Sequence, residues 1–305
     1  MIVNSDTLAA IRTDFQAIFL ESYAGFVARW PDAATEFPST TESLDLSWIG
    51  EVPSMKEWLD ERVIEGLRRY RYAITNKNWE ATIRVDRNAI EDDTLGVYRP
   101  RIQGLGQEAK RHPEEIISDL LINGDDTTLG LAFDAAAFFA NTRSVGDSGN
   151  IDNLLAGTGV TQAQFQADYI AAKVALAGYK NDRGKPMNPV LNKLLCVVPP
   201  ALEFVAKQTF NATIISQTQN ILVGEADVWA NPYVGADDAN DWYLLNIGGP
   251  IKPLAISMRR RPGFDALDDP RSEHVFKNRS FLYGTDGRYV GGYLLPWMAA
   301  KTINS

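Results

Sequence analysis

The stretch from Glu91 to Gly124 reads EDDTLGVYRPRIQGLGQEAKRHPEEIISDLLING, and it determines the fold that we predict for the whole chain. Its apolar and small residues recur mostly three and four positions apart, which is the spacing of one face of an α-helix. They are Leu95, Tyr98, Ile102, Leu105, Ala109, Ile116 and Leu120. We therefore predict one long helix, a structural spine whose apolar stripe is buried against another part of the protein.

Both ends of this predicted helix carry stop and start signals. The acidic residues and threonine at 92–94 provide N-cap chemistry and negative charge at the start. The Asn-Gly pair at 123–124 provides a stop. Pro100 lies within the first two turns, where a missing N–H costs little. Pro113 removes an internal donor, so we expect a kink near His112.

The composition is that of a globular protein with a large core. The chain has 305 residues, of which 45% are hydrophobic and 23% charged, and a prior of about 150 residues per domain suggests two domains. No window approaches the roughly 18 apolar residues of a membrane span, and the N-terminus lacks the pattern of a secretory signal, so we expect a cytoplasmic protein that does not enter a membrane. The single cysteine, Cys196, lies in the apolar run LLCVV and is expected to be a buried hydrophobic residue. The formal net charge of −9 argues against a surface that neutralises nucleic-acid phosphates.

The N-terminal part predicts helices joined by an extended arm. Residues 6–26 have helical spacing of apolar side chains, with Ser5 or Asp6 as the cap. The stretch 31–48, PDAATEFPSTTESLDLSW, has few apolar residues and is expected to be extended. A second helix is predicted from Ser54, which forms a capping-box spacing with a glutamate three residues later.

Residues 70–87, YRYAITNKNWEATIRVDR, alternate apolar and polar side chains on both sides of the turn residues NKN. This pattern predicts a β-hairpin. A lone two-stranded ribbon is marginally stable in water, so the face that carries Tyr72, Ile74, Trp79 and Ile83 needs a cover from this chain or from another copy.

The second half of the chain predicts a mixed α/β region followed by mainly β structure. A capping box at Thr161 and Gln164 opens a helix, and Leu194 to Val198 form a buried strand. The stretch 130–143 contributes Phe133, Phe138 and Phe139 among small residues. Short strands are expected at 221–229, 241–247, 253–258 and 280–295. We expect the last of these to be a pair of strands that turn near Asp286 and Gly287.

Residues 104–109, GLGQEA, match the GxGxxA dinucleotide fingerprint, with acids at 125–126 near the offset of a ribose contact. The fingerprint requires a buried strand directly before it, whereas YRPRIQ contains a proline and two arginines. Close packing of a helix against its neighbour is therefore the preferred explanation of Gly104 and Gly106. A soluble nucleotide-binding enzyme is kept as an alternative function.

Other candidate sites lack partners in the sequence. The two histidines, His112 and His274, have no thiolates or further imidazoles at ligand spacing, and both are expected to be structural or solvated. The acids of 268–273 are expected to form a flexible loop, and the basic run MRRRP at 258–262 is expected to make a charged subunit contact rather than to bind nucleic acid. We accordingly predict no catalytic, cofactor-binding or metal-binding residue.

Five separated segments, in this order, resemble the major head subunit family of Mu-like bacteriophages and prophages. The segments are WEATIRVDRNAIEDDTLGVYRP (79–100), QEAKRHPEEII (107–117), FDAAAFFANTR (133–143), GKPMNPVLNKLLCVVPPALE (184–203) and FKNRSFLYGTDGRYVGGY (276–293). The chain departs from the family pattern at Ala135 and Arg143, where a glycine and a histidine are common. This departure concerns the local turn geometry.

The resemblance implies an α+β fold, the tailed-phage major capsid fold. Its parts would be an N-terminal arm (1–45), an extended β-hairpin loop (46–85), a peripheral domain with the spine helix (86–184 and 255–305) and an axial domain (185–254). It implies a major capsid protein without enzymatic activity or cofactor, which assembles into hexamers and pentamers that form an icosahedral shell around double-stranded DNA. Its partners would be copies of itself, and a scaffolding protein and portal during assembly; its location would be the virion capsid, and the host cytoplasm before that. Another phage structural protein, such as a tail or portal component, is the nearer alternative.

The subunit-interface candidates are Trp48, Tyr72, Ile74, Trp79 and Ile83. We expect aspartate at Trp79 or Ile83 to spare the folding of the monomer and to block assembly. No particular lysine and asparagine pair marks a covalent cross-link, so none is predicted. Because the first helix begins within a few residues of Met1, we expect no long cleavable scaffolding segment at the N-terminus.

Overall fold

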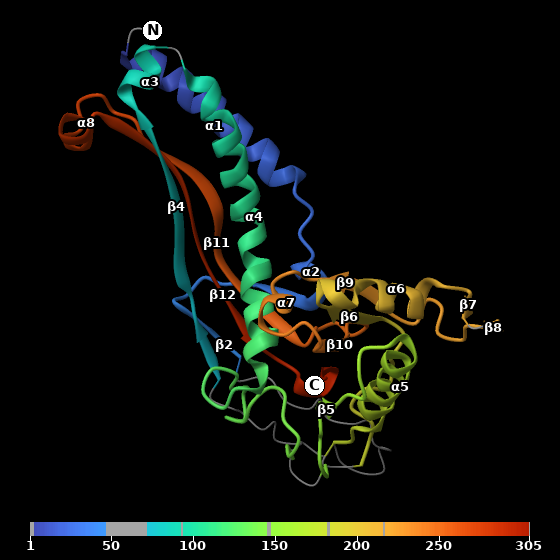
Figure 1. The fold of residues 1–305 in the computed structure, drawn as a ribbon. Coiled ribbons are helices and arrows are strands. Elements are labelled where there is room, and N and C mark those ends of the chain that lie inside the picture. The colour runs from blue at the N-terminus through green and yellow to red at the C-terminus, as the bar shows by residue number, and fades with distance from the viewer. Residues whose placement is uncertain are drawn as a thin grey trace.

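The computed structural model describes residues 3–46, 72–92, 94–144, 148–181, 184–215 and 217–304, and only the backbone of Asp237. Trp48 and the helix predicted from Ser54 lie outside these residues. The molecule is elongated, with two long helices and a ribbon of long strands at one end and a compact sheet with shorter helices at the other (Figure 1). This mixture confirms the predicted α+β class. Within the described residues, no helix is long and apolar enough to cross a membrane.

The spine helix forms, but it begins later than predicted. α4 spans Arg99–Ile122, and it is preceded by a short helix α3 (Arg87–Glu91) and a 3-10 turn η1 (Leu95–Val97). Asp86 is the N-cap of α3, and its side chain accepts a hydrogen bond of 2.8 Å from a backbone N–H. An acidic N-cap therefore occurs on α3, before the spine helix, rather than at the predicted residues 92–94. Pro100 then starts α4, since its missing N–H would have no partner in a first helical turn.

The buried stripe of α4 changes position at Pro113. Up to that residue it follows the prediction, with Ile102, Leu105 and Ala109 buried. Beyond it, Ile117 and Leu121 are fully buried in place of the predicted Ile116 and Leu120. The latter two pack instead against β12, where a Cβ on Gly291 would lie 2.6 Å from Ile116 and 2.9 Å from Leu120. α4 continues through Pro113 without a break and ends at the predicted C-cap, Asn123.

The first helix, α1 (Ser5–Gly25), lies along α4 (Figure 1). Its cap is Asn4 rather than the predicted Ser5 or Asp6, and the Asn4 side chain accepts a hydrogen bond from the backbone of Thr7 at 2.8 Å. Phe15 and Phe19 of α1 are buried in a core that it shares with α4 and the long strands. The predicted apolar face of this helix is confirmed.

The long strands form a four-stranded sheet in the order β1-β11-β12-β4. Their bounds are β1 Ala34–Pro38, β4 Lys77–Asp86, β11 Leu254–Leu267 and β12 Ser280–Tyr293. β1 is parallel to β11, and the other two pairings are antiparallel. In the stretch 31–48, predicted to be extended, residues 34–38 and 43–45 form β1 and β2, whereas 31–33 belong to the short helix α2 (Trp30–Ala33). β1 is held in the sheet of its own subunit.

The hairpin predicted at residues 70–87 is wrong. β3 (Ala73–Thr75) pairs with β2 (Ser43–Asp45), whereas β4 pairs with β12, so the two halves of the expected ribbon have different partners. Asn76 explains why the chain does not turn back at NKN, because its buried side-chain amide donates hydrogen bonds of 3.1–3.2 Å to Ser39, Thr41 and Glu42. These bonds tie the junction to the N-terminal segment.

The turn predicted at Asp286 and Gly287 is also wrong. β12 runs through both residues as one strand, and the reversal between β11 and β12 lies at 268–279, where α8 (Glu273–Asn278) is located. A glycine is needed at 287 for close packing, since an added Cβ would lie 2.8 Å from the ring of Tyr289. The glycine that predicted a turn is therefore required by close packing within the sheet.

The compact end is built on a second sheet in the order β5-β13-β10-β6-β9. Its strands are β5 Leu154–Ala156, β6 Leu194–Val198, β9 Asp227–Ala230, β10 Trp242–Asn246 and β13 Ala299–Ile303. Every residue of β6 and β10 is buried, which confirms the apolar strands predicted there. Two strands, β5 and β13, come from outside the predicted 185–254 segment.

Helices α5 (Gln162–Gly178) and α6 (Glu203–Asn211) pack together beside this sheet. The capping box predicted at Thr161 and Gln164 is present, and Cys196 is buried in β6 as expected. The remaining short elements are α2 Trp30–Ala33, α7 Val234–Asp237, η2 Asn123–Asp125, η3 Pro200–Leu202, η4 Pro296–Met298, β7 Ile214–Ile215 and β8 Thr218–Gln219.

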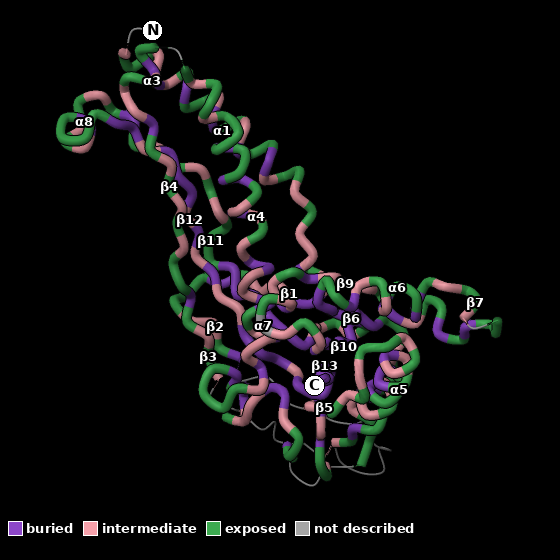
Figure 2. Tube along the Cα trace, viewed as in Figure 1, coloured by how far each residue is buried: buried purple, intermediate pink, exposed green. Residues whose placement is uncertain are grey.

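Burial is unevenly distributed along the molecule (Figure 2). The larger core surrounds the five-stranded sheet and the C-terminal half of α4, and it contains Phe133, Phe138 and Phe139. A smaller core joins α1, the N-terminal half of α4 and one face of the four-stranded sheet. The other face of that sheet carries no helix in the described part of the chain (Figure 1).

Candidate functional site

The predicted interface residues lie against their own chain in the structure. Tyr72, Ile74, Trp79 and Ile83 are all half-buried and pack on one of the two cores, while Trp48 lies outside the described residues. The cover that the sequence required for this apolar face is therefore supplied within the subunit.

Two of these residues contact the C-terminal end of β12. The Tyr72 hydroxyl accepts a hydrogen bond of 3.1 Å from the backbone N–H of Tyr293. Ile74 packs over Gly292, where an added Cβ would lie 2.9 Å from its side chain. β3 is thus fixed to the four-stranded sheet by side chains and not by a ladder of backbone bonds.

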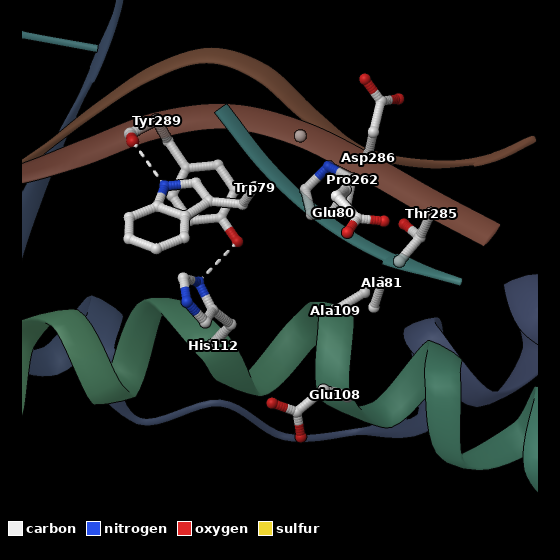
Figure 3. Close-up of a pocket in the computed structure, with 11 residues that line it drawn as sticks. Trp79, Glu80, Ala81, Glu108, Ala109, His112, Pro262, Thr285, Asp286 and Tyr289 are labelled. Atoms are coloured by element: carbon white, nitrogen blue, oxygen red, sulfur yellow. Dashed lines mark hydrogen bonds between the residues drawn. The ribbon is translucent and has the colours of Figure 1, made fainter. Parts of the chain in front are cut away.

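Trp79 belongs to an aromatic cluster between the spine helix and the sheet (Figure 3). Its indole N–H donates to the carbonyl oxygen of Tyr289 at 2.9 Å, and its ring centroid lies 4.4 Å from that of His112. His112 Nδ1 lies 2.9 Å from the Tyr289 hydroxyl. The three rings border a cavity of about 100 Å³ whose lining also includes Glu108 of α4 and Asp286 of β12. The cluster fixes the middle of α4 to β4 and β12.

The electrostatics of this cluster suit a structural histidine. Burial lowers the pKa of His112, although the carboxylates of Glu115, Glu108 and Asp119 act in the opposite direction. The lowered pKa favours the neutral imidazole, and its contact with the Tyr289 hydroxyl gives His112 a structural role between α4 and β12. Within the described residues there is no set of three metal-binding side chains.

The glycine pattern at 104–109 lies wholly inside α4. Gly106 is required by helix packing, since a Cβ there would lie 2.6 Å from the carbonyl oxygen of Phe19 in α1. Gly104 faces open space. Asp125, one of the acids near the ribose offset, instead forms an ion pair with the buried Lys301, with 2.9 Å between its carboxylate oxygen and the lysine Nζ. These contacts account for Gly106 and Asp125 without a nucleotide, whereas the close packing predicted for Gly104 is wrong.

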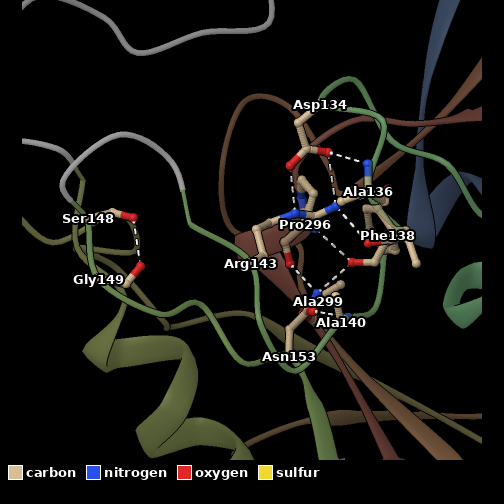
Figure 4. A network of polar contacts seen from close by, with 11 residues as sticks. Asp134, Ala136, Phe138, Ala140, Arg143, Ser148, Gly149, Asn153, Pro296 and Ala299 are labelled. Atoms are coloured by element: carbon tan, nitrogen blue, oxygen red, sulfur yellow. Dashed lines mark hydrogen bonds and ion pairs between the residues drawn. The ribbon is translucent and has the colours of Figure 1, made fainter. Parts of the chain in front are cut away.

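A buried arginine organises the loop that follows the spine helix (Figure 4). Arg143 is 2% exposed, and its guanidinium forms a two-point ion pair with Asp134, with distances of 2.8 and 3.1 Å. It also donates to the carbonyl oxygens of residues 136, 137 and 138. Burial lowers the pKa of Arg143, and Asp134 opposes this shift. The guanidinium thereby provides hydrogen-bond donors for the backbone carbonyl groups of this loop.

Asn153 connects this loop to the compact end. Its amide donates to the carbonyls of Phe138, Pro296 and Ala299 at 2.9, 2.9 and 3.2 Å (Figure 4). The loop is therefore bound to the strand β13 through one side chain.

Ala135, one of the two departures from the family pattern, has a φ of +61°. This left-handed conformation favours glycine, because an L side chain approaches the following carbonyl there. An alanine therefore occupies a strained turn position that glycine would adopt at little cost.

The basic and acidic runs make contacts within the chain. Arg259 donates to the carbonyl of Ser39 at 3.3 Å, Arg260 pairs with Asp286, and Arg261 pairs with Glu36. The run 258–262 therefore links β11 to neighbouring segments of the same subunit.

The acidic segment is more ordered than expected. Asp268 is buried and pairs with Arg12 of α1 at 3.3 Å. The ring of His274 lies within hydrogen-bond distance of Asn278 and Ser280, as a structural histidine does.

Large apolar side chains are exposed at both ends of the molecule, and the sequence interpretation missed them. Phe276 of α8 is 87% exposed, and at the compact end Phe204 of α6 and Val174 of α5 are 77% and 65% exposed. The available signal was a large apolar residue inside a charged run, as in EHVFKNR. Large exposed side chains of this kind mark contact surfaces when they cluster.

A profile of the Mu-like prophage major head subunit gpT family matches residues 8–165, 155–234 and 233–304. The chain belongs to this family. The major head subunit of the Mu-like prophage FluMu of Haemophilus influenzae is 26% identical over 301 residues, covering 99% of this chain and 74% of the relative. The major capsid protein of Escherichia phage Mu is 25% identical over 304 residues, covering 99% and 75%.

Solved capsids share the fold. A subunit of the bacteriophage JBD30 procapsid superimposes with a TM-score of 0.61 at 26% identity, covering 99% of this chain and 77% of that one. A virus-like particle subunit from Pyrococcus furiosus gives a TM-score of 0.56 at 9% identity, covering 95% and 98%, and so shares the fold alone. The predicted fold of the tailed-phage major capsid protein is thereby confirmed.

Proposed function

We propose that this chain is the major head subunit of a Mu-like phage or prophage, and that copies of it form hexamers and pentamers that close an icosahedral shell. The observation that carries the proposal is the family match, which extends without a gap from residue 8 to residue 304. The elongated shape supports it, because a shell subunit exposes much of its surface to neighbours and obligate interfaces commonly exceed about 2,000 Å².

The parts of the subunit would divide the work of assembly. We assign residues 1–45 to an N-terminal arm, 46–85 to an extended loop, 86–184 with 255–305 to a peripheral domain, and 185–254 to an axial domain. The five-stranded sheet, to which β5 and β13 also contribute, would then join the axial and peripheral parts.

The interface assignment of Trp48, Tyr72, Ile74, Trp79 and Ile83 is part of this proposal. The half-buried state of the last four supports a specific form of it, in which each side chain first packs on its own subunit and leaves only its outer part to a neighbour. Such residues would act by positioning β4 and β3 for assembly.

The partners follow from the same role. Scaffolding protein and portal would bind the subunit during assembly in the host cytoplasm, and the finished shell would hold double-stranded DNA in the virion. A formal net charge of −9 is consistent with a container that does not grip phosphates. The work of this protein would be association, without catalysis or cofactor.

Electron microscopy of the purified full chain, alongside calorimetric titration with ATP and NAD, tests the proposal. Rings or closed shells and no heat on titration are expected. A protein that stays dispersed under all assembly conditions and releases heat on binding a nucleotide would support the enzyme alternative instead.

A further inference from the structure

The uncovered face of the four-stranded sheet contains a hollow near one end of the ribbon. Gly284 of β12 lies in register with Thr82 of β4 and Asp265 of β11, and all three side-chain positions point away from α1 and α4. Because the central position is a glycine, backbone forms the floor. The hollow measures about 270 Å³.

Two leucines and three carboxylates surround this hollow. Leu267 and Leu282 face each other across β11 and β12 on the side toward α8. Glu80, Asp265 and Asp286 line the rest. Asp286 is paired with an arginine of β11, whereas no ion pair to Asp265 or Glu80 is found in the described part of the chain. The hollow therefore combines an apolar edge with unneutralised negative charge.

The helix α8 carries the complementary features. Phe276 projects into solvent, while the next residue toward the N-terminus, Val275, is 3% exposed and anchors the helix. Arg271 and Arg279 flank α8, and neither has an ion-pair partner among the described residues. A helix that carries an exposed phenylalanine and is flanked by two arginines without ion-pair partners complements a hollow with two leucines and two carboxylates that lack ion-pair partners. One of these, Glu80, accepts a hydrogen bond of 2.9 Å from Thr82.

The α8 helix of one copy does not reach the hollow of that same copy. β11 and β12 remain paired from Gly263↔Asp286 to Leu267↔Leu282, so the ladder holds α8 beyond the end of the ribbon. Figure 1 shows α8 at the far end of β11 and β12, away from the body of the molecule. The occupant of the hollow must come from another molecule.

We propose that α8 of a second copy of this chain docks on this hollow, with Phe276 between Leu267 and Leu282 and with Arg271 and Arg279 facing Asp265 and Glu80. The proposal rests on the proposed function, in which copies associate, and it names one contact between them. Charge complementarity favours a second copy as the occupant, because the cations and the aromatic ring are supplied by the same sequence.

Cross-linking tests the contact directly. The chain has one cysteine, and it is buried, so introduced cysteines react in a clean background. The double variant F276C/L282C, assembled and treated with a short bis-maleimide, is expected to give covalent dimers or longer ladders on denaturing gels. F204C/L282C is the matched control, because Phe204 is similarly exposed on a different element and is expected to give none.

Substitution supplies an independent measurement. F276S is expected to lower the yield of shells about tenfold, as the loss of one good contact does. Adding F204S to the F276C/L282C variant is expected to leave the cross-link unchanged. The charge reversals R271E and D265R should each weaken assembly, and the pair together should recover part of the yield.

Each outcome bears on one of the two proposals. Normal shells from F276S, or shells of F276C/L282C in which no cross-link forms between copies, would overturn the docking contact and leave the head-subunit function standing. Failure of the wild-type protein to assemble at all would count against the proposed function and against this contact with it. Circular dichroism of F276S, expected to match the wild type, separates lost assembly from lost folding.

Discussion

His112 and Tyr289 join the spine helix to the central strand of the long ribbon, with the imidazole Nδ1 2.9 Å from the phenolic oxygen. Trp79 covers this pair from the edge strand and bonds to the backbone of Tyr289. The cluster thus lies where three elements meet, although its members are far apart in the sequence. Its contacts make the stability of the subunit dependent on pH.

The first prediction concerns that dependence. Burial lowers the pKa of His112 in the folded protein, so the unfolded chain binds the proton more readily below its ordinary pKa of about 6.5. The contribution of neutral His112 to stability is therefore complete above that pH and declines as the pH falls toward the lower folded value. Denaturant unfolding of the wild type and of H112Q from pH 7.5 to 5 should show the wild type losing its advantage over this window. A constant difference between the two proteins would contradict the prediction.

The second prediction replaces the expectation that aspartate at Trp79 spares the monomer. Trp79 packs on its own core and donates a hydrogen bond there, so W79D should destabilise the isolated subunit by about 3 kcal/mol or more. W79F, which loses chiefly the hydrogen bond, should cost about 1 kcal/mol. V97D, at a side chain that is 62% exposed, should change the unfolding free energy by less than about 0.5 kcal/mol. Urea unfolding under conditions that prevent assembly measures all three.

The third prediction separates the two glycines of the spine helix. G106A places a methyl group 2.6 Å from the carbonyl oxygen of Phe19 and should destabilise the subunit by about 1–3 kcal/mol. G104A meets nothing within 4 Å and should stabilise the helix by about 1 kcal/mol, since alanine is the better helix former. Thermal unfolding of both variants should give shifts of opposite sign. Equal effects would mean that α1 does not pack closely on α4.

The fourth prediction uses the strained turn. A135G relieves the left-handed conformation at a φ of +61° and should stabilise the subunit by about 0.5–1 kcal/mol, after allowance for the greater freedom of glycine in the unfolded chain. A137G is the control, because Ala137 is absent from the residues with positive φ and should lose stability on the same change. A higher melting temperature for A137G than for A135G would argue against this account.

The fifth prediction concerns the buried guanidinium. R143K keeps the charge but loses the two-point pair with Asp134 and most of the carbonyl contacts, so it should cost about 3 kcal/mol or more. R99K breaks a comparable pair with Asp14 at the surface, where both side chains are about half exposed, and should cost less than about 1 kcal/mol. Limited proteolysis should also cut the loop after α4 faster in R143K than in the wild type.

Local signals in the sequence predicted the elements that local contacts determine. The capping box at Thr161 and Gln164, the stop at Asn123 and the apolar strand around Cys196 all occur where the sequence placed them. Each depends on residues within a few positions of one another. The family resemblance added the overall fold, which no single element could have supplied.

The errors occurred where a distant partner decides the outcome. The alternation at 70–87 correctly indicated strands, but β4 pairs with a strand about 200 residues away, and β3 pairs with β2, so the short turn NKN was the wrong guide. Asp286 and Gly287 are residues typical of turns, but both lie within β12, and the glycine is required there by close packing against Tyr289. Phe276 was missed because an exposed aromatic residue carries no periodic signal.

The pairing of β4 with β12 has a consequence for how the polypeptide is made. The ribosome adds roughly 5–20 residues per second, so about 10–40 seconds separate the synthesis of the edge strand from that of its partner. During that interval the backbone N–H and C=O groups of β4 that will pair with β12 lack their partners. This part of the ribbon can therefore form only late in synthesis, after the spine helix is already complete.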